Sequence, residues 1–210
     1  MQKIFSSDQV RKADAYTIKN EPVSSIDLME RAAGSCVEWM NKSQDLSSKN
    51  VIIFCGPGNN GGDGLAIARL LHEKQVHVSA FIPDESSKLS EDFAINLHRA
   101  KESGVNLQFF EAFDFKQATE NFVLIDALFG SGLSKPLEDN YKELVDILNK
   151  NKCITISIDI PSGLYADKPI DMDKDSVIKS DYTLCFQFPK LAFLFPENEF
   201  FAGSKSRSSG

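Results

Sequence analysis

The chain has 210 residues, 42% of them hydrophobic, and a formal net charge of −7 at pH 7. This length and apolar content suffice for one substantial core, so we expect a single domain. The acidic balance excludes a protein built to neutralise a nucleic-acid backbone, and no stretch is long and apolar enough to predict a membrane span.

Two helices are predicted before the first strand. Ser6-Ser7-Asp8-Gln9 has the form of a capping box and introduces a helix that runs to about Lys19. A second helix begins at Ser24 or Ser25 and carries a broad apolar face. Because these helices are an addition to a plain doubly wound domain, we expect them to cover an edge of the sheet or to make a dimer contact.

Strands and helices alternate through the rest of the chain. Apolar runs predict strands at 51–55, 76–82, 106–110, 121–126, 153–159 and 181–186, with helices at about 65–71, 90–103 and 139–150. This alternation predicts a mostly parallel sheet covered on both faces. Ligands of such sheets bind beyond the carboxyl ends of the strands, so the loops that follow the strands are the candidate site.

A glycine-rich turn, 56–64, follows the first strand and contains five glycines in nine residues. Gly56, Gly58 and Gly61 match G-x-G-x-x-G between a strand and a helix, whereas the absence of a following Gly-Lys-Ser/Thr excludes a Walker-type phosphate loop. Such a turn leaves backbone N–H groups open to a ligand. It indicates a nucleotide-binding loop.

Asp63 does not fit the usual dinucleotide pattern. It stands where the helix N-cap is expected, and its carboxylate would repel a pyrophosphate bound to the same amides. We therefore expect a neutral part of the ligand near Asp63, and a simple N-cap is the alternative. Asn59 and Asn60 are either turn residues or amide donors and acceptors that face the cavity.

Two further loops follow strands in the same manner. Asp126 ends the fourth strand and precedes 127–136, and Asp159 ends the fifth and precedes 160–164. If the strands are parallel, both aspartates converge with the Asn59-Asn60 turn on one crevice.

Asn60, Asp126 and Ser162 are hard oxygen donors with no thiolate or imidazole among them. Such a set favours an alkali or alkaline-earth ion over zinc or iron and leaves magnesium and potassium equally open. Capping of the following turns is the other interpretation of Asp126 and Ser162.

Carboxylates are the acid–base candidates, because no histidine falls in these loops. Asp159 follows the longest β-branched strand, so we expect it to be the most desolvated and to act as general acid/base. A Ser-His-Asp hydrolase is disfavoured because the chain has no Gly-x-Ser-x-Gly elbow. The four cysteines stand in apolar contexts without Cys-x-x-Cys spacing, which predicts a reduced, cytoplasmic protein and leaves an organelle open.

Three motifs together resemble the NAD(P)H-hydrate epimerases, the YjeF N-terminal domain family. They are Gly-Pro-Gly-Asn-Asn-Gly-Gly-Asp-Gly at 56–64, Asp-Ala-Leu-Phe-Gly-Ser-Gly-Leu at 126–133 and Asp-Ile-Pro-Ser-Gly-Leu at 159–164. The resemblance implies an α/β, Rossmann-like three-layer sandwich with a mostly parallel central sheet, usually as a homodimer. It also implies an isomerase that repairs nicotinamide nucleotides by interconverting the R and S epimers of hydrated NADH and NADPH.

The family pattern carries over to particular positions here. It implies substrate contacts at Asn59, Asn60, Gly61, Gly62, Asp63, Gly130, Ser131, Gly132, Leu133, Ser134, Lys135, Pro136 and Asp159. A potassium ion would be held by Asn60, Asp126 and Ser162. Lys135 stands where the family often has Arg, which keeps the charge but loses the planar fork for phosphate, so a preference for NADPH hydrate stays open.

Residues 1–200 are expected to form one domain of this type, and 201–210 a polar tail that is disordered or is a tag or truncation remnant. The chain could also be the N-terminal half of a bifunctional epimerase/dehydratase. The alternative function is a non-catalytic nucleotide-binding or scaffolding module of the same fold. A plain NAD-dependent dehydrogenase is disfavoured by Asp63 and by the lack of a catalytic His or Tyr.

Overall fold

The computed structural model of the protein describes residues 4–21, 23–46, 48–84, 87–113, 122–137 and 139–208. Its strands form one sheet in the order β3-β2-β1-β4-β5-β6-β7, and each neighbouring pair is parallel. The strands are β1 Asn50–Cys55, β2 His77–Ile82, β3 Asn106–Phe109, β4 Phe122–Ala127, β5 Ile154–Ile158, β6 Tyr182–Phe186 and β7 Ser204–Ser208. The order reverses between β1 and β4, which places a ligand crevice at their carboxyl ends.

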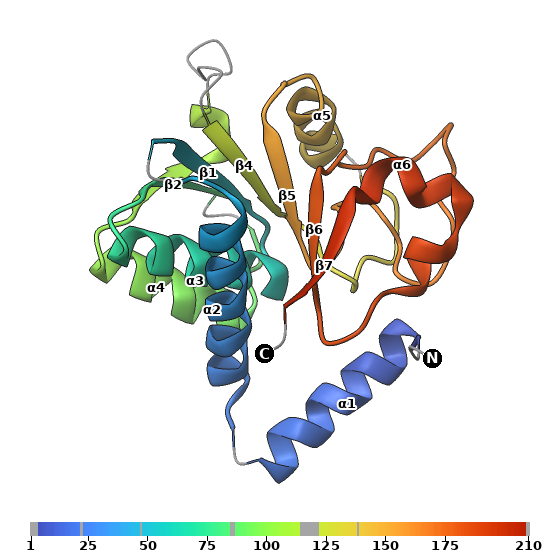
Figure 1. Ribbon diagram of the computed structural model, residues 1–210, viewed down its shortest axis with the longest axis horizontal. Coiled ribbons are helices and arrows are strands. Elements are labelled where there is room, and N and C mark those ends of the chain that lie inside the picture. The colour runs from blue at the N-terminus through green and yellow to red at the C-terminus, as the bar shows by residue number, and fades with distance from the viewer. Residues whose placement is uncertain are drawn as a thin grey trace.

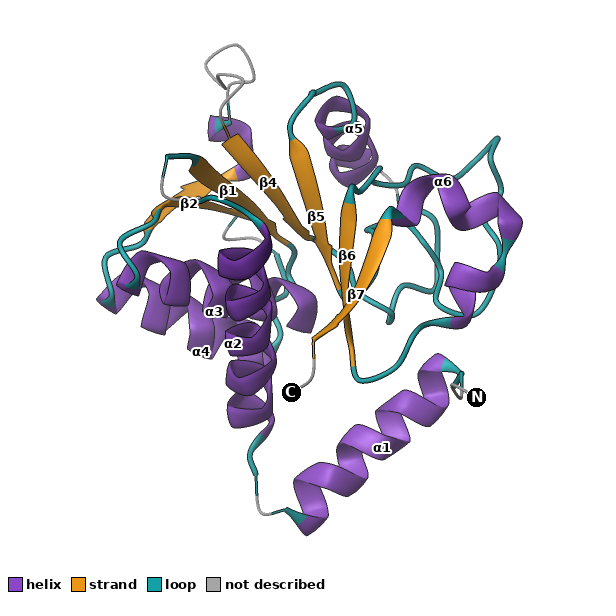
Figure 2. Cartoon of the chain, in the orientation of Figure 1, coloured by secondary structure: helices purple, strands orange, loops and turns teal. Residues whose placement is uncertain are grey.

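Helices cover both faces of this sheet, as Figures 1 and 2 show. They are α1 Ser7–Asn20, α2 Ser25–Ser43, α3 Asn59–Glu73, α4 Glu91–Glu102, α5 Asp139–Leu148 and α6 Glu199–Ala202, with short 3-10 helices at Phe110–Ala112, Leu191–Leu194 and Pro196–Asn198. Helices α2, α3 and α4 lie together on one face, and α5 lies on the other. The predicted Rossmann-like three-layer sandwich is confirmed. Among the described helices, none has the length and apolarity required to cross a bilayer.

The core consists of layers on the two faces of the sheet, because successive strand residues point in opposite directions. Ile53 and Ile125 pack with α2, α3 and α4, whereas Phe54 and Leu124 pack with Val145 and its neighbours on α5. Strands buried on both faces need no polar alternation, which explains their continuous apolar runs. A third cluster fills the space near α6.

Both predicted N-terminal helices are present. The Ser6 capping box forms at α1 as expected, and the Ser24 hydroxyl caps α2. Helix α2 joins the helical layer, and α1 lies apart from the sheet in Figure 1. Ser7 donates to the Asp167 carboxylate at 3.0 Å, and the Phe5 ring packs on Phe188 with centroids 4.5 Å apart. These contacts hold α1 against the carboxyl-terminal part of the fold.

The end of the chain differs from the expected disordered tail. Phe201 and Ala202 are buried, and Ser204–Ser208 pair with β6 as the parallel edge strand β7. Edge pairing depends on backbone hydrogen bonds and not on an apolar run, so this Ser-rich segment carries no strand pattern in its sequence.

Helix α3 also begins earlier than predicted. Its first residue is Asn59 and its N-cap is Gly58, so Asp63 lies inside the first turns of the helix and the N-cap interpretation of Asp63 is wrong. Close backbone packing requires glycine at two positions of this turn. A Cβ on Gly61 would lie 1.7 Å from the Gly56 carbonyl oxygen, and one on Gly56 would lie 1.8 Å from the Leu128 carbonyl oxygen. The glycines bring the loops after β1 and β4 into direct backbone contact.

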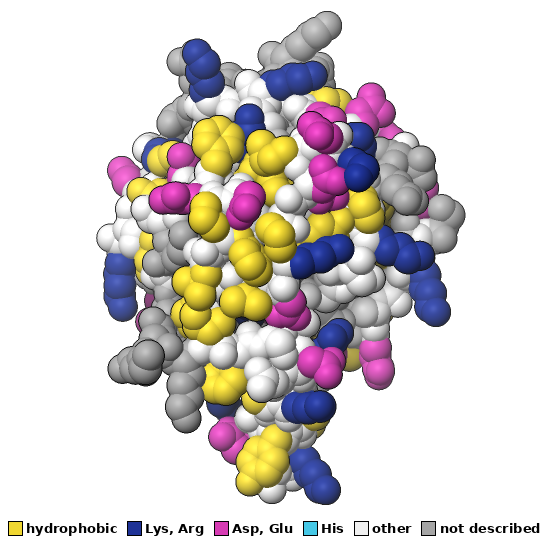
Figure 3. All heavy atoms as spheres, turned by 90° about the vertical axis from the view of Figure 1, so that its right-hand side faces the viewer, with side chains coloured by type: hydrophobic (Ala, Val, Ile, Leu, Met, Phe, Trp, Pro, Cys, Tyr) yellow, Lys and Arg dark blue, Asp and Glu magenta, His cyan; other side chains and the backbone are white. Residues whose placement is uncertain are grey.

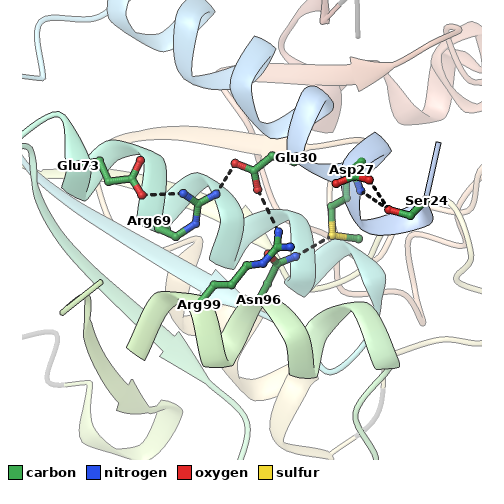
Figure 4. Close-up of polar contacts among 8 residues, drawn as sticks. Ser24, Asp27, Glu30, Arg69, Glu73, Asn96 and Arg99 are labelled. Carbon is green, nitrogen blue, oxygen red and sulfur yellow. Dashed lines mark hydrogen bonds and ion pairs between the residues drawn. The ribbon is translucent and has the colours of Figure 1, made fainter. Parts of the chain in front are cut away.

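A cluster of charged side chains fastens α2, α3 and α4 to one another (Figure 4). Glu30 of α2 pairs with Arg69 of α3 and, at 3.6 Å, with Arg99 of α4, and Arg69 also contacts Glu73 at 2.6 Å. Beside it the Met29 sulfur accepts a hydrogen bond from the Asn96 amide at 3.1 Å. Met29 packs directly over Gly62, so this cluster braces the helix start that enters the candidate site.

Candidate functional site

A cavity of about 790 Å³ lies beyond the carboxyl ends of β1, β4 and β5. Its walls come from the start of α3, from the loop after β4, from Asp159 after β5 and from Ser7, Arg11 and Asp14 on α1. A second hollow of about 430 Å³ between α1 and α2 shares Asp14, Asp63 and Asp159 with it. The two spaces therefore meet at three carboxyl groups. A third hollow, of about 730 Å³, lies at the amino ends of β1 and β2, away from these groups.

Most of the predicted site residues line this cavity. They are Asn59, Asn60, Asp63, Gly130, Ser131, Gly132, Leu133, Ser134, Lys135, Pro136 and Asp159. Gly61 and Gly62 are not on its wall, because they pack against the Gly56 backbone and Met29. Asp126 and Ser162 lie behind the wall with no exposed surface.

Asp159 is held in place from several directions. Its backbone has φ of 66°, a strained conformation for a non-glycine residue, and its N–H donates to the Leu184 carbonyl at 2.8 Å. One carboxylate oxygen accepts from the Ser131 N–H at 2.9 Å, and the other lies 2.8 Å from the Lys190 ammonium. Burial alone would raise the pKa of Asp159, but the Lys190 charge and these hydrogen bonds outweigh it and lower the pKa below the ordinary value. Asp159 is thus an ionised carboxylate at neutral pH.

Asp63 has the opposite environment. Burial raises its pKa well above the ordinary value, and the charges of Asp159, Asp92 and Asp14 raise it further. Among the residues that the structure describes, no basic side chain pairs with it. Asp63 therefore favours the uncharged, proton-bearing form, which removes the repulsion of a pyrophosphate expected from its sequence position.

Asp14 of α1 is the third carboxyl group at the junction. It accepts a hydrogen bond from the Gln187 side chain. Burial raises its pKa from the ordinary value, although Gln187 and Lys190 partly offset that effect. The sequence-based reasoning missed both Asp14 and Lys190, which lie far from the glycine turn along the chain. The Pro189-Lys190 pair directly after the last predicted strand was the available signal for Lys190.

Asp126 and Ser162 form a buried pair behind the cavity. The Ser162 hydroxyl and backbone N–H donate to the two Asp126 oxygens at 2.5 and 2.9 Å, and the Ser157 hydroxyl donates at 2.7 Å. Burial raises the pKa of Asp126 even against these hydrogen bonds. The Ser162 hydroxyl also accepts the Phe129 N–H at 2.9 Å, so this pair fixes the start of the loop after β4.

Asn60, in the first turn of α3, lies near Asp159. Both polar atoms of its amide are buried without a hydrogen-bond partner. A Cβ on Gly130 would lie 3.1 Å from the nearer Asp159 oxygen and 3.2 Å from Asn60 Oδ1, so the two side chains both lie close to Gly130. A buried, unsatisfied amide oxygen fits an oxygen-coordinated cation or a polar ligand group, since such atoms are rarely left unpaired.

Comparison with known proteins found a matching family model and similar sequences. Residues 25–192 match the family model described as YjeF-related protein N-terminus. The chain is 37% identical to an NAD(P)H-hydrate epimerase of Weissella koreensis over 97% of its own length and 89% of the relative. It is 34% identical to the NAD(P)H-hydrate epimerase of Oenococcus oeni, over 95% and 92% of the two chains.

Two other relatives extend this picture. A bifunctional NAD(P)H-hydrate repair enzyme, Nnr, of Thermofilum pendens is 34% identical over 87% of this chain and 34% of its own length. The crystal structure of the yeast protein YNL200c superposes with a TM-score of 0.79 at 23% identity, covering 98% of this chain and 87% of that one. The structural likeness supports the fold, and the sequence matches carry the family.

Proposed function

The chain belongs to the family of YjeF-related protein N-termini, and we propose that it is an NAD(P)H-hydrate epimerase. The reaction interconverts the R and S epimers of hydrated NADH and NADPH. The observation that carries this proposal is the meeting of two carboxyl groups in a cavity at the carboxyl ends of the sheet: Asp159, whose pKa is lowered beside the Lys190 ammonium, and Asp63, whose pKa is raised by burial.

The chemistry needs one proton donor and one proton acceptor near a single carbon, which bears a hydroxyl beside the ring nitrogen. If the C–O bond breaks, its electron pair leaves with the hydroxyl, which takes up a proton, and the nitrogen lone pair forms a C=N bond. Water then adds to the other face and releases a proton. If the C–N bond breaks instead, the nitrogen takes up a proton, the hydroxyl releases one, and reclosure on the other face reverses both transfers.

We assign the acceptor role to Asp159 and the donor role to Asp63. Both carboxyl groups line both hollows, so a ring placed at the junction contacts the two together. Their environments separate their proton affinities, as an acid–base pair requires. In the C–O route one turnover moves a proton from Asp63 to Asp159, and exchange with solvent in the cavity restores the starting state; in the C–N route reclosure returns both protons to their starting groups.

The rest of the substrate occupies the larger cavity. The first turn of α3 presents backbone N–H groups and the positive end of the helix dipole, which suit hydroxyl or phosphate oxygens. The segment 130–136 forms the facing wall, and Lys135 supplies an exposed positive charge for phosphate. Gly61 and Gly62 act by close packing, Gly61 on the Gly56 backbone and Gly62 on Met29, and not by touching the substrate.

We further propose that Asn60, Asp126 and Ser162 hold a potassium ion. The unpartnered Asn60 oxygen supports this proposal, as does the hard-oxygen character of the set. When bound, the ion would add a positive charge behind the wall of the cavity. Replacement of potassium by a larger organic cation should weaken nucleotide binding measured by calorimetry, and unchanged affinity would contradict the assignment.

Assembly as a homodimer completes the proposal. Apolar side chains gather on the face seen in Figure 3. Met172, Leu194 and Phe200 are each more than half exposed, as side chains at a dimer contact would be in a single copy. Light scattering on the purified chain should give the mass of two copies, and Leu194→Glu tests whether Leu194 belongs to the contact. If Leu194→Glu remains a dimer, the interface does not include Leu194. A cytoplasmic location fits cysteines that form no disulfide in the described part of the chain.

The activity is tested on a mixture of hydrated NADH epimers with an S-specific dehydratase. The dehydratase alone consumes one epimer, and the added protein should allow complete consumption at a rate that rises with its concentration. Asp159→Asn should reduce that acceleration to a small residual rate, whereas Asp146→Asn, on the exposed face of α5, should leave it unchanged. If the protein binds the nucleotide but does not accelerate epimerisation, it is instead a non-catalytic nucleotide-binding module.

A further inference from the structure

Lys190 has an unusual position for a lysine. It is only 3% exposed and follows β6 in the turn 186–190. Within that turn Gln187 has a positive φ of 54°, and the Phe188 N–H donates to the Phe186 carbonyl at 2.6 Å. Phe5 forms an isolated β-bridge with Lys190. The backbone of Lys190 is therefore fixed from both sides.

The Lys190 side chain points back to the candidate site. Its ammonium lies 2.8 Å from an Asp159 oxygen and 3.4 Å from the Phe186 carbonyl oxygen. Among the described residues that line the two hollows, it is the buried cation. Arg11 is 65% exposed and pairs with Asp8, and Lys135 lies on the exposed rim. This buried positive charge thus lines the same hollow as three carboxyl groups, and of these three the structure shows Asp159 in contact with it.

Stability alone does not account for such a pair. A buried ion pair contributes little compared with well-packed apolar side chains, because both charges lose their hydration. The pair instead differentiates the carboxyl groups of the cavity. Asp159 has a cation in contact, whereas the charges that act on Asp63 are the negative ones of Asp159, Asp92 and Asp14.

We propose that Lys190 is a positioning residue for the epimerisation: its ammonium keeps Asp159 ionised and oriented as the proton acceptor, and leaves Asp63 as the proton donor. This inference rests on the proposed function. Lys190 itself forms and breaks no bond to the substrate. It acts through Asp159, so its effect must depend on pH and must disappear when Asp159 is no longer a carboxylate.

The test compares Lys190→Met and Lys190→Arg with the wild type in kcat/KM as a function of pH. Loss of the cation should raise the pKa of Asp159, so the acidic limb of the Lys190→Met profile should move up by about one to three pH units. At a fixed pH on that limb, kcat/KM of Lys190→Met should be about tenfold below wild type for each pH unit by which the limb moves. Lys190→Arg should keep a profile close to wild type. A uniform loss at every pH would mean that Lys190 only supports the fold, and would overturn the proposal.

The double variant Asp159→Asn/Lys190→Met provides a second readout. It should be no less active than Asp159→Asn alone, because the lysine acts through the missing carboxylate. Independent, multiplicative losses would contradict this mechanism. The double variant also removes both members of the buried pair, so it should fold even if Lys190→Met alone does not.

A measurement without substrate separates this inference from the proposed function. The Asp159 carboxyl can be titrated by carbon-13 NMR in the ligand-free protein, assigned by its loss in Asp159→Asn. Its pKa should be higher in Lys190→Met, or in Lys190→Gln as a second neutral variant, than in wild type. Equal values would overturn the role of Lys190 whatever the activity, whereas an inactive wild-type protein would overturn the epimerase assignment alone.

Discussion

Gly61→Ala offers a sharp test of how the loops of the site are built. Gly61 lies in the first turn of α3, where exchange of glycine for alanine normally gains up to about 1 kcal/mol in helix propensity. Here the added Cβ would lie 1.7 Å from the Gly56 carbonyl oxygen and 2.8 Å from the Gly56 nitrogen. Non-bonded carbon contacts are optimal near about 3.5 Å, and a backbone carbonyl cannot rotate away.

The cost of this clash should therefore exceed the gain in helix propensity. Overpacking against a well-ordered core costs about 1–3 kcal/mol, and a clash with backbone belongs at the upper end, so we expect a net loss of about 2–3 kcal/mol. For a chain of this size the Tm should fall by about 4–12 °C. Urea unfolding and calorimetry measure both quantities.

Gly34→Ala is the matched control for this substitution. Gly34 lies in α2, and no atom lies within 4 Å of the position of its Cβ. The same change should raise stability by about 0.5–1 kcal/mol there, because only the propensity term acts. Equal stability of the two variants would refute the close packing of the first turn of α3 on the Gly56 backbone.

The remaining predictions concern charge and hydrogen bonding in the site. Because the pKa of Asp63 is raised in the folded protein, its burial lowers stability increasingly as pH rises above the ordinary Asp value, by about 1.4 kcal/mol for each unit of the shift. Asp63→Asn should therefore raise the Tm at neutral pH, lose that advantage near about pH 3, and slow epimerisation; a variant with wild-type activity would exclude Asp63 as the proton donor. The pKa of Asp159 is lowered, so its contribution to stability is complete above the ordinary value near about 4 and is lost as pH falls through the lower folded value. Asp159→Asn should cost about 3–5 kcal/mol at neutral pH by leaving Lys190 unpaired, and urea midpoints should converge with wild type in acid. Ser162→Ala removes hydrogen bonds to Asp126 and Phe129, and should cost about 1–3 kcal/mol and weaken potassium binding by calorimetry; an unchanged protein on both counts would argue against the buried pair.

The position of the site was predictable because it depends on topology. Asp126 is the last residue but one of β4, Asp159 directly follows β5, and the glycine turn follows β1. Once the alternating pattern indicates parallel strands, their carboxyl ends must share one edge of the sheet. The structure accordingly brings Asp159, Asn60 and the segment 130–136 to one cavity.

Features that depend on packing were not predictable in the same way. Glycine is a poor helix former, so the sequence predicts a helix that starts only after the glycine run. In the structure α3 starts at Asn59, and its Gly61 packs closely on the Gly56 backbone. The ionisation of Asp159 depends on Lys190, which reaches the site only because β6 lies beside β5. Burial of Asp159 was expected, but its charge could not be predicted without that partner.

The central claim is that this cavity inverts one carbon of a hydrated nicotinamide ring. The most direct measurement starts from a single purified epimer of hydrated NADH and follows the ratio of R to S forms by chromatography with catalytic amounts of protein. The account predicts that the wild-type protein brings the epimers to equilibrium much faster than the spontaneous reaction and that Asp159→Asn does not. An unchanged rate with wild-type protein, or equal acceleration by Asp159→Asn, would contradict it.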